Sequence, residues 1–201
     1  MEWEWVEFEE VIQKVEKTKK VPKKSFLESG DFPVVSQESE LVSGFWNIEA
    51  DVFKATSPVV IFGDHTKVVK YVDFDFVLGA DGVKVLKPIE GLNAKFFAYY
   101  LSSIQLKDLG YARHYRLLKE IKVPVPSIKE QKRIVATLDE ALADIDKARA
   151  LTERNLENAR ELFESYLLEL FGKPNKDWKV EKLKALTSKI GSGATPKGGK
   201  A

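Results

Sequence analysis

The chain has 201 residues, of which 44% are hydrophobic and 31% are charged, proportions typical of one or two soluble globular units. It contains no cysteine and two histidines, which excludes disulfides and thiolate zinc sites and leaves little for an imidazole metal centre. No stretch approaches the roughly 18 unbroken apolar residues of a membrane span, and the acidic N-terminus is unlike a signal peptide, so we expect a cytoplasmic protein without a membrane partner.

Charge is unevenly distributed along the chain although the formal net charge is only +1. Five of the first ten residues are Glu, whereas the next stretch is rich in lysine: Lys14, Lys17, Lys19, Lys20, Lys23 and Lys24. A second basic run comprises Arg113, Arg116, Lys119, Lys122, Lys129, Lys132 and Arg133. Such runs usually mark a solvated face, but they also suit contacts with DNA phosphates.

Residues 58–87, PVVIFGDHTKVVKYVDFDFVLGADGVKVLK, predict a compact sheet. β-branched and aromatic runs at 59–62, 68–72, 74–78 and 83–86 are separated by Gly-Asp and Asp-Gly turns. A short amphipathic helix is predicted over 93–101. Residues 1–123 are therefore expected to form one mixed α/β (α+β) domain, large enough for its own core.

Two acidic groups in this region resemble reactive sites but have simpler explanations. Asp64 and His65 beside Thr66 have the residue types of a proton-transfer site, yet a Gly-Asp turn after a strand is explained by backbone geometry. Asp73, Asp75 and Asp81 lack the alternating ligands and closing Glu of a calcium loop. We predict no catalytic and no metal-binding residue here.

Asp108 and the Glu120-Ile121-Lys122 triplet resemble the acidic and E-x-K elements of a metal-dependent nuclease. The pattern is short and common, and it lies next to a Val-Pro-Val-Pro stretch that reads as a linker. A stand-alone Mg²⁺ nuclease is therefore kept as an alternative.

The segment GYARHYR, residues 110–116, concentrates groups that read DNA. Arginine can fork onto guanine or phosphate, and tyrosine and imidazole add further contacts. The alternative is an amphipathic loop packed on the sheet.

A long helix is predicted from Ser127 to Phe171. Ser127 and Glu130 have the spacing of a capping box, and Gly172 followed by Pro174 ends the helical pattern. About 45 residues at 1.5 Å each give a helix of roughly 67 Å, far longer than a typical globular helix.

Every third and fourth residue of this helix forms a heptad seam, which favours pairing with another helix. Its apolar members are Val135, Leu138, Leu142, Ile145, Leu156, Phe163, Tyr166 and Leu170. Arg149 and Thr152 interrupt it midway. The alternative is a helix lying against its own domain.

The C-terminal stretch GSGATPKGGKA is not a phosphate-binding P-loop, because Ala194 and Ala201 replace the first glycine and the metal-binding hydroxyl. A different pattern precedes it. WEWVEFEEV (3–11) and WKVEKLKAL (178–186) share Trp followed by apolar residues two, five and eight positions later. We interpret residues 173–201 as the start of a second copy of the unit that opens at residue 1.

Two stretches resemble a known family. PVPSIKEQKRIVATLDEALADIDKARA from Pro124, preceded by FGDHTKVVKYVDFDFVLGADGVKVL, resembles the specificity subunit of type I restriction-modification enzymes, and TSKIGSGATPK looks like the opening of a target recognition domain. The resemblance implies a target recognition domain over 1–123, a spacer and dimerisation helix over 124–172 in an antiparallel coiled coil with a partner helix, and a truncated second repeat over 173–201. The chain departs from complete family members in length, with one recognition domain, one helix and the start of a repeat, and in this it resembles the half-sized or fragmented forms of the family.

The family likeness further implies a non-catalytic chain that binds double-stranded DNA and methyltransferase subunits, with restriction subunits as further partners. S-adenosylmethionine, ATP and Mg²⁺ would belong to those partner subunits. The expected DNA-contacting residues are Arg113, His114, Tyr115, Arg116, Gln37, Lys19, Lys20, Lys23, Lys24 and Lys67. A homodimer joined through the seam would read a two-part target. A coiled-coil adaptor that binds only protein is a second alternative.

Overall fold

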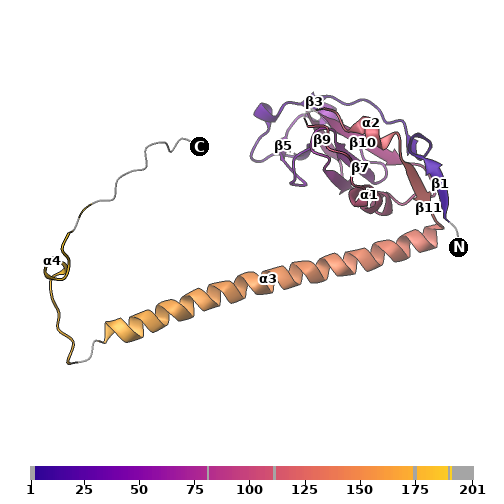
Figure 1. Cartoon of the computed structure of the whole chain (residues 1–201). Coiled ribbons are helices and arrows are strands. Elements are labelled where there is room, and N and C mark those ends of the chain that lie inside the picture. The colour runs from indigo at the N-terminus through magenta and orange to yellow at the C-terminus, as the bar shows by residue number, and fades with distance from the viewer. Residues whose placement is uncertain (1–2, 81, 111, 174–175, 190, 192–201) are drawn as a thin grey trace. The chain divides into compact units, whose positions relative to one another are not determined.

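The computed structural model describes residues 3–80, 82–110, 112–173, 176–189 and 191 (Figure 1). The chain divides into two compact units, Met1–Ala143 and Asp144–Ala201. The first unit holds the sheets and the first turns of the long helix α3 (Ile128–Gly172). The second holds the rest of α3 and a single helical turn, α4 (Leu183–Leu186).

The described strands of the first unit form three sheets. β1 (Glu4–Glu7) pairs antiparallel with β11 (Lys122–Val125), placing Trp5 opposite Pro124. A four-stranded sheet has the order β2 (Ile12–Gln13), β10 (Val83–Pro88), β7 (Val59–Gly63), β8 (Val69–Val72). A five-stranded sheet has the order β3 (Lys20–Val21), β9 (Phe76–Gly79), β4 (Phe32–Val35), β5 (Gly44–Trp46), with β6 (Val52–Phe53) also paired to β9.

β7 lies between β10 and β8 in the four-stranded sheet and is buried along its whole length. Val60 and Phe62 belong to one hydrophobic cluster, and Val59 and Ile61 belong to another. Because successive strand side chains point to opposite faces, β7 is covered on both sides. This explains why its sequence is a continuous apolar run rather than an alternating one.

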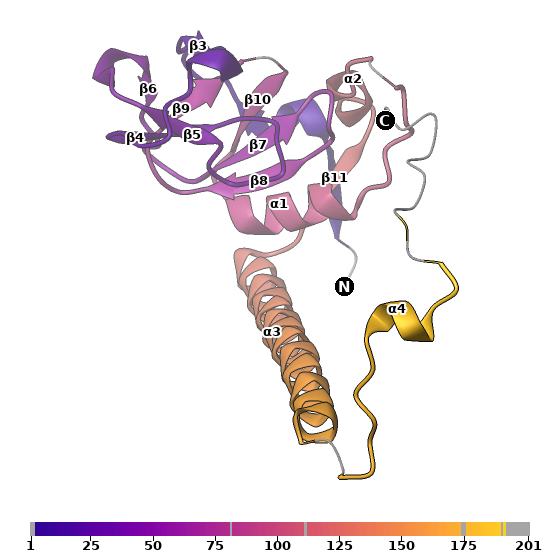
Figure 2. The same cartoon turned by 90° about the vertical axis from the view of Figure 1, so that its left-hand side faces the viewer.

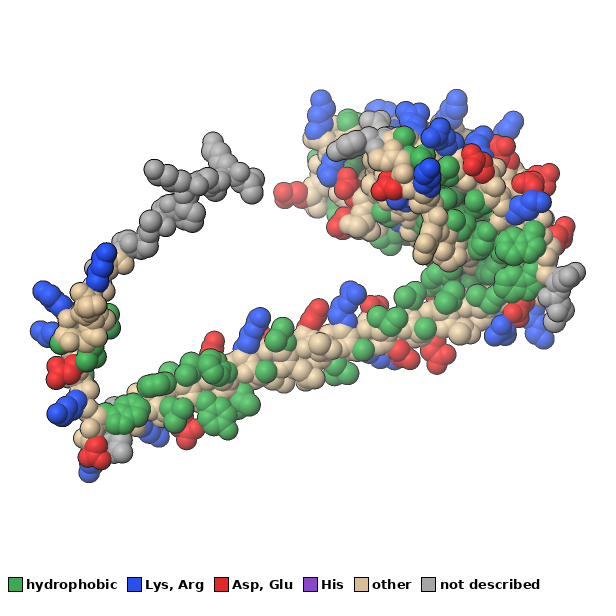
Figure 3. Space-filling view, in the orientation of Figure 1, with side chains coloured by type: hydrophobic (Ala, Val, Ile, Leu, Met, Phe, Trp, Pro, Cys, Tyr) green, Lys and Arg blue, Asp and Glu red, His purple; other side chains and the backbone are tan. Residues whose placement is uncertain are grey.

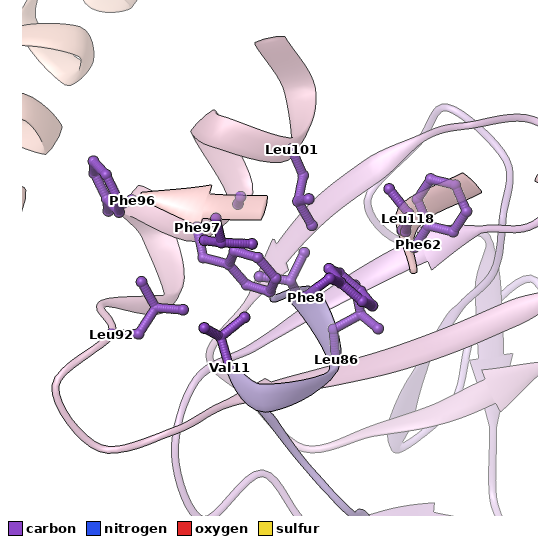
Figure 4. Packing of buried hydrophobic residues seen from close by; sticks show 12 residues of the cluster. Phe8, Val11, Phe62, Leu86, Leu92, Phe96, Phe97, Leu101 and Leu118 are labelled. Atoms are coloured by element: carbon purple, nitrogen blue, oxygen red, sulfur yellow. The ribbon is translucent and has the colours of Figure 1, made fainter. Parts of the chain in front are cut away.

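The larger cluster joins segments that are distant in sequence. Phe8 and Val11 from the N-terminal segment belong to the same cluster as Phe97 of α1 (Ala94–Ser103), Leu118 of α2 (Tyr115–Leu118) and Phe62 of β7 (Figure 4). Helix α1 packs against β7, β8 and β10 (Figure 2). The N-terminal segment, residues 3–11, therefore helps to close the core and packs in the same unit as α2.

The strands and the helix predicted within residues 58–101 are confirmed as β7, β8, β9, β10 and α1. The single compact sheet predicted for these strands is wrong, because β9 pairs with β3, β4 and β6 in the five-stranded sheet while β7, β8 and β10 share the four-stranded one. β9 starts at Phe76 rather than Phe74, and the carboxylate of Asp75, just before the strand, accepts a hydrogen bond from the Ala55 backbone N–H at 2.8 Å. Asn93 caps α1 by accepting bonds from the backbone N–H groups of Lys95 and Phe96, each at 3.0 Å. The predicted fold class, a mixed domain followed by one long helix, is confirmed.

α3 begins and ends within one residue of the prediction. Only half of the capping box forms: the Ser127 hydroxyl accepts from the Glu130 backbone N–H at 3.4 Å, while the Glu130 carboxylate pairs with Arg133 at 2.7 Å. One seam prediction needs correction. Val135 is partly buried against the core of its own domain together with Ile134, because the apolar stripe runs without a break from the seam into that contact.

In the second unit, every described residue of α3 from Asp144 onward is exposed. The rings of Phe171 and Trp178 lie 6.0 Å apart between centroids. The two segments with matching sequence, 3–11 and 178–186, each contain a short helical turn at the same aligned position. Phe8–Glu10 forms a 3₁₀ turn, and α4 starts at Leu183, the residue that aligns with Phe8. The C-terminal stretch GSGATPKGGKA lies outside the described residues except for Gly191. Among the helices that the structure describes, none is both long and apolar enough to cross a membrane.

Candidate nucleic-acid interface

The turn between β7 and β8 anchors the predicted reading segment. The buried carboxylate of Asp64 accepts a hydrogen bond from the Tyr115 backbone N–H at 2.7 Å, and the Asp64 carbonyl accepts from the His114 backbone N–H at 2.8 Å. Leu118 is buried in the core at the other end of α2. The short helix is therefore held by a strand turn some 50 residues earlier in the sequence.

His114 does not face outward, and its prediction as a groove-facing residue is wrong. Its side chain is 1% exposed. Nε2 accepts from the Leu109 backbone N–H at 3.1 Å, so Nδ1 carries the proton and donates to the Asp64 carbonyl at 3.0 Å. The His114 ring therefore orders the loop that leads into α2. Sequence composition alone could not distinguish this structural role from a role in contacting bases.

Tyr115 is half-buried and takes part in packing. Its ring meets Phe8 edge-on with centroids 6.1 Å apart, and the Lys84 ammonium lies 5.1 Å from the ring centroid. Burial raises the pKa of the Tyr115 hydroxyl above its usual value. Because Tyr115 is only partly exposed, it lies at the boundary between the core and the surface.

Arg113 and Arg116 are both exposed. Neither makes an ion pair or a hydrogen bond with another side chain in the described part of the chain. A guanidinium that has no internal partner keeps its fork of donors for a phosphate or a guanine edge. Of the predicted reading residues, these two best match their expected exposure.

Gln37 packs onto the same β7–β8 turn from another direction. Its side-chain oxygen accepts from the His65 backbone N–H at 3.3 Å, and its carbonyl accepts from the Thr66 hydroxyl at 2.7 Å. Gly82, at φ +72°, closes over this contact, because an added Cβ would lie 2.6 Å from the His65 ring and 2.8 Å from the Gln37 oxygen. The turn therefore gathers Gln37 and the segment 113–116 in one region.

Lys67 belongs to this turn and has a positive φ of 61°. Its ammonium lies 3.7 Å from the Asp108 carboxylate. A hydrogen bond from the Gly110 backbone N–H, followed by the charge of Lys67, lowers the pKa of Asp108. The loop before α2 is thus tied to the turn by charge as well as by His114.

Three of the four predicted N-terminal lysines have partners within the domain. Lys19 lies 3.1 Å from Asp51, Lys23 lies 3.0 Å from Glu38, and the Lys20 ammonium donates to the Val83 carbonyl at 2.7 Å. Lys24 is exposed. Because Val83 follows Gly82, the Lys20 bond brings β3 beside the β7–β8 turn. β3 and α2 lie on the same upper side of the domain in Figures 1 and 2, where Lys and Arg side chains crowd the rim in Figure 3.

Two of the three residues of the nuclease alternative, Asp108 and Lys122, have separate structural partners. Lys122 lies 3.2 Å from Glu7 across the β1–β11 pair, and Asp108 is held by Gly110 and Lys67. Within the described residues, no group of three or more His, Asp or Glu side chains is arranged to hold a metal ion. The geometry therefore gives this alternative no support.

Comparison with known proteins gives a consistent result. The family model for the type I restriction modification DNA specificity domain matches residues 1–158. The EcoR124I/EcoR124II specificity subunit of Escherichia coli is 26% identical over 160 residues, which cover 76% of this chain and 39% of that protein.

Two solved structures match part of the chain. A chain from a structure of type I R-M complex assembly and conformational transition has a TM-score of 0.57 at 22% identity, covering 78% of this chain and 43% of that one. The HsdS subunit of Thermoanaerobacter tengcongensis has a TM-score of 0.47 at 20% identity, covering 72% and 38%. The chain spans about two fifths of the length of these relatives. By its match over residues 1–158, the chain belongs to the family of type I restriction modification DNA specificity domains.

Proposed function

We propose that this chain is a non-catalytic DNA-reading subunit that dimerises through α3, reads a two-part target and carries methyltransferase subunits. Its family membership supports sequence recognition of DNA. In this proposal, S-adenosylmethionine, ATP and Mg²⁺ act on partner subunits, restriction subunits among them, and the assembly works in the cytoplasm.

The observation that carries the proposal is the exposed seam of α3. Six of its apolar side chains are between 47% and 64% exposed: Leu142, Ile145, Leu156, Phe163, Tyr166 and Leu170. A regular apolar stripe of this kind is costly in water, at about 25 cal/mol per Å², and a second copy of the same stripe would cover it.

An antiparallel pairing about a twofold axis matches the two halves of the seam. When the twofold axis passes midway between Arg149 and Thr152, Arg149 of one helix lies opposite Thr152 of the partner helix. The two arginines therefore do not face one another. The same register places Leu142 opposite Ala159, a large side chain against a small one. Leu138 then lies opposite Phe163, and Ile145 opposite Leu156. This complementarity favours the antiparallel arrangement.

Cross-linking tests the register, and the absence of native cysteine makes it clean. In the double variant Leu142→Cys with Ala159→Cys, a short thiol-to-thiol cross-linker should produce covalent dimers. The single variant Leu142→Cys is the control, because its two copies would lie about 25 Å apart along the helices. Covalent dimers from the single variant would indicate parallel helices and overturn the arrangement.

For DNA reading, we infer that the β7–β8 turn carries the contact surface. Arg113 and Arg116 would reach phosphate or base edges, with Tyr115 and Gln37 at the border of the surface. Lys67 and the lysines of residues 19–24 would contact phosphates and fix the register. His114 would act through the loop that it orders.

A binding measurement with a matched partner tests this surface. The chain, together with its methyltransferase subunits, should protect two half-sites of equal sequence on DNA, and its affinity should fall steeply as salt rises. Lack of binding at low salt with those subunits present would favour the protein adaptor instead. Protection of a single asymmetric site by one copy would contradict the dimeric reader.

A further inference from the structure

We propose that Gln131 and Asp139 are positioning residues that lock the first three turns of α3 onto the reading domain. The lock would define how far apart, and at what rotation, two reading domains engage DNA. The effect of the lock on the spacing of DNA half-sites rests on the proposed function, whereas its effect on the rigidity of the junction between α3 and the domain does not.

Gln131 is completely buried although it lies on a helix that is exposed along most of its length. Its side-chain oxygen accepts from the Asn93 backbone N–H at 2.7 Å. Its side-chain nitrogen donates to the Gly91 carbonyl at 2.9 Å and to the Pro126 carbonyl at 2.8 Å. Both donors and the acceptor of the amide are therefore used, which fixes its orientation.

These bonds connect the starts of two helices. Asn93 caps α1, but the third residue of α1 is Phe96, which has no acceptor to return to the Asn93 backbone N–H as a capping box would. Gln131 supplies that acceptor from α3. Through Pro126, just before Ser127, the same side chain also holds the chain that enters α3. One amide thus joins the N-terminal ends of α1 and α3.

Asp139 forms the second point of the lock, eight residues further along the same face of α3. Its carboxylate accepts from the Lys95 ammonium at 2.7 Å and from the Tyr99 hydroxyl. Lys95 and Tyr99 lie one turn apart on α1. Two attachment points separated by about 12 Å along a helix restrict its direction as well as its position.

Apolar packing fills the space between the two points. Ile134 and Val135 pack against the main hydrophobic cluster, which includes Phe96 and Phe97 of α1. The face of α3 that touches the domain therefore combines a buried amide, two aliphatic side chains and an ion pair. Polar bonds with fixed geometry specify one arrangement, which apolar contacts alone do not.

A fixed junction has a direct consequence for a dimer that reads two half-sites. Each added base pair moves one half-site by about 3.4 Å and rotates it by about 35° around the DNA axis. A locked junction cannot follow that change, so it should accept one spacing. A loosened junction should accept several.

Spin labels test the lock in the intact chain without reference to DNA. We would label Glu28→Cys and Ala143→Cys, both exposed positions, with unlabelled chain in excess, and measure the distribution of distances between the labels. The parent should give one narrow distribution. Gln131→Ala should at least double its width, and Lys132→Ala, an exposed neighbour, should leave it unchanged.

Asp139→Ala covers the case in which Gln131→Ala does not fold, because Asp139 is partly exposed and outside the core. It should also broaden the distribution, and Asp139→Glu should restore part of the parent width. Folded Gln131→Ala and Asp139→Ala variants with the narrow parent distribution would overturn the proposal.

The DNA arm measures binding to targets in which the gap between half-sites changes by one base pair at a time. The parent should prefer one gap by at least tenfold, and both variants should reduce that preference to threefold or less. If the variants broaden the distances but keep the preference, the lock does not set spacing and the DNA part of the proposal fails. If the parent reads no two-part target while the distances respond as expected, the proposed function fails and the lock stands.

Discussion

The reading domain and the distal part of α3 use the same kinds of apolar residue in opposite ways. In the domain, Phe97 and Phe62 are buried among segments from across the first 123 residues. In α3, Phe163 and Leu170 are more than half exposed. The domain therefore holds its own core within one chain, whereas the helix leaves an apolar face exposed, which the proposed dimer would cover.

The largest expected effect is on the stability of the domain, and the same substitution, Phe to Ala, distinguishes the domain from the distal part of α3. Phe97→Ala should destabilise the domain by about 3–5 kcal/mol, because it leaves a cavity in a closed core. Phe163→Ala should leave the unfolding of the domain unchanged and weaken self-association instead. Denaturant unfolding followed by near-ultraviolet circular dichroism, with sedimentation of the same samples, distinguishes the two. Equal losses of domain stability would contradict this division.

The next largest effect concerns the anchor of α2. Asp64→Ala removes the acceptor of the Tyr115 backbone N–H and should cost about 1–3 kcal/mol of domain stability. DNA affinity should fall as well, because the segment 113–116 loses its support. Asp64→Asn, which keeps an acceptor oxygen, is the matched control and should retain more of both. If Asp64→Ala affects neither, α2 is positioned by other contacts.

Arg113→Ala and Arg116→Ala should each weaken target binding by about 1–3 kcal/mol without changing stability, because both side chains are exposed. Arg154→Ala, an exposed arginine on the outer face of α3, is the control and should bind like the parent. His114→Ala should differ from both by lowering stability, since its ring is buried. Unchanged binding by both arginine variants would remove them from the contact surface.

The smallest effect is the pH dependence of the contact between α1 and α3. Hydrogen bonds from Lys95 and Tyr99 lower the pKa of Asp139, so its stabilising effect is present above the unfolded value near 4 and is lost as pH falls through the lower folded value. Burial, followed by the bond to Asp139, raises the pKa of Tyr99 to about 12, so its effect is present below pH 10 and is lost as pH rises towards 12. The variant Tyr99→Phe with Asp139→Asn should show a flatter stability profile at both ends. A profile identical to the parent would show that this pair does not contribute.

Much of the fold follows from local sequence pattern. β7 to β10 were predictable because their β-branched runs are continuous and bounded by turns, and α3 because its period and end signals are strong. β3 and β6 were not, since each is two residues long and exists only through pairing with β9, a strand distant in sequence. Long-range pairing leaves little trace in local composition.

The candidate site was predictable in residue type but not in orientation. Arg113 and Arg116 are exposed as predicted, whereas His114 turns inward because the backbone of Asp64 and Leu109 offers it partners. The seam was also predictable in residue type but not in environment. The same heptad pattern includes Val135, which packs against the core of the domain, and the residues of α3 that are exposed further along. Gln131, a polar residue in an apolar stripe, was a signal for the junction between α1 and α3 that the period alone did not explain.

Self-association through α3 is the central claim, and the mass of the chain in solution tests it most directly. Sedimentation equilibrium at micromolar concentration should give twice the 22.8 kDa of the single chain. The variant Ile145→Glu, which places a charge in the seam, should shift this mass to that of one chain while the domain stays folded. A parent mass of 22.8 kDa under the same conditions would contradict the account.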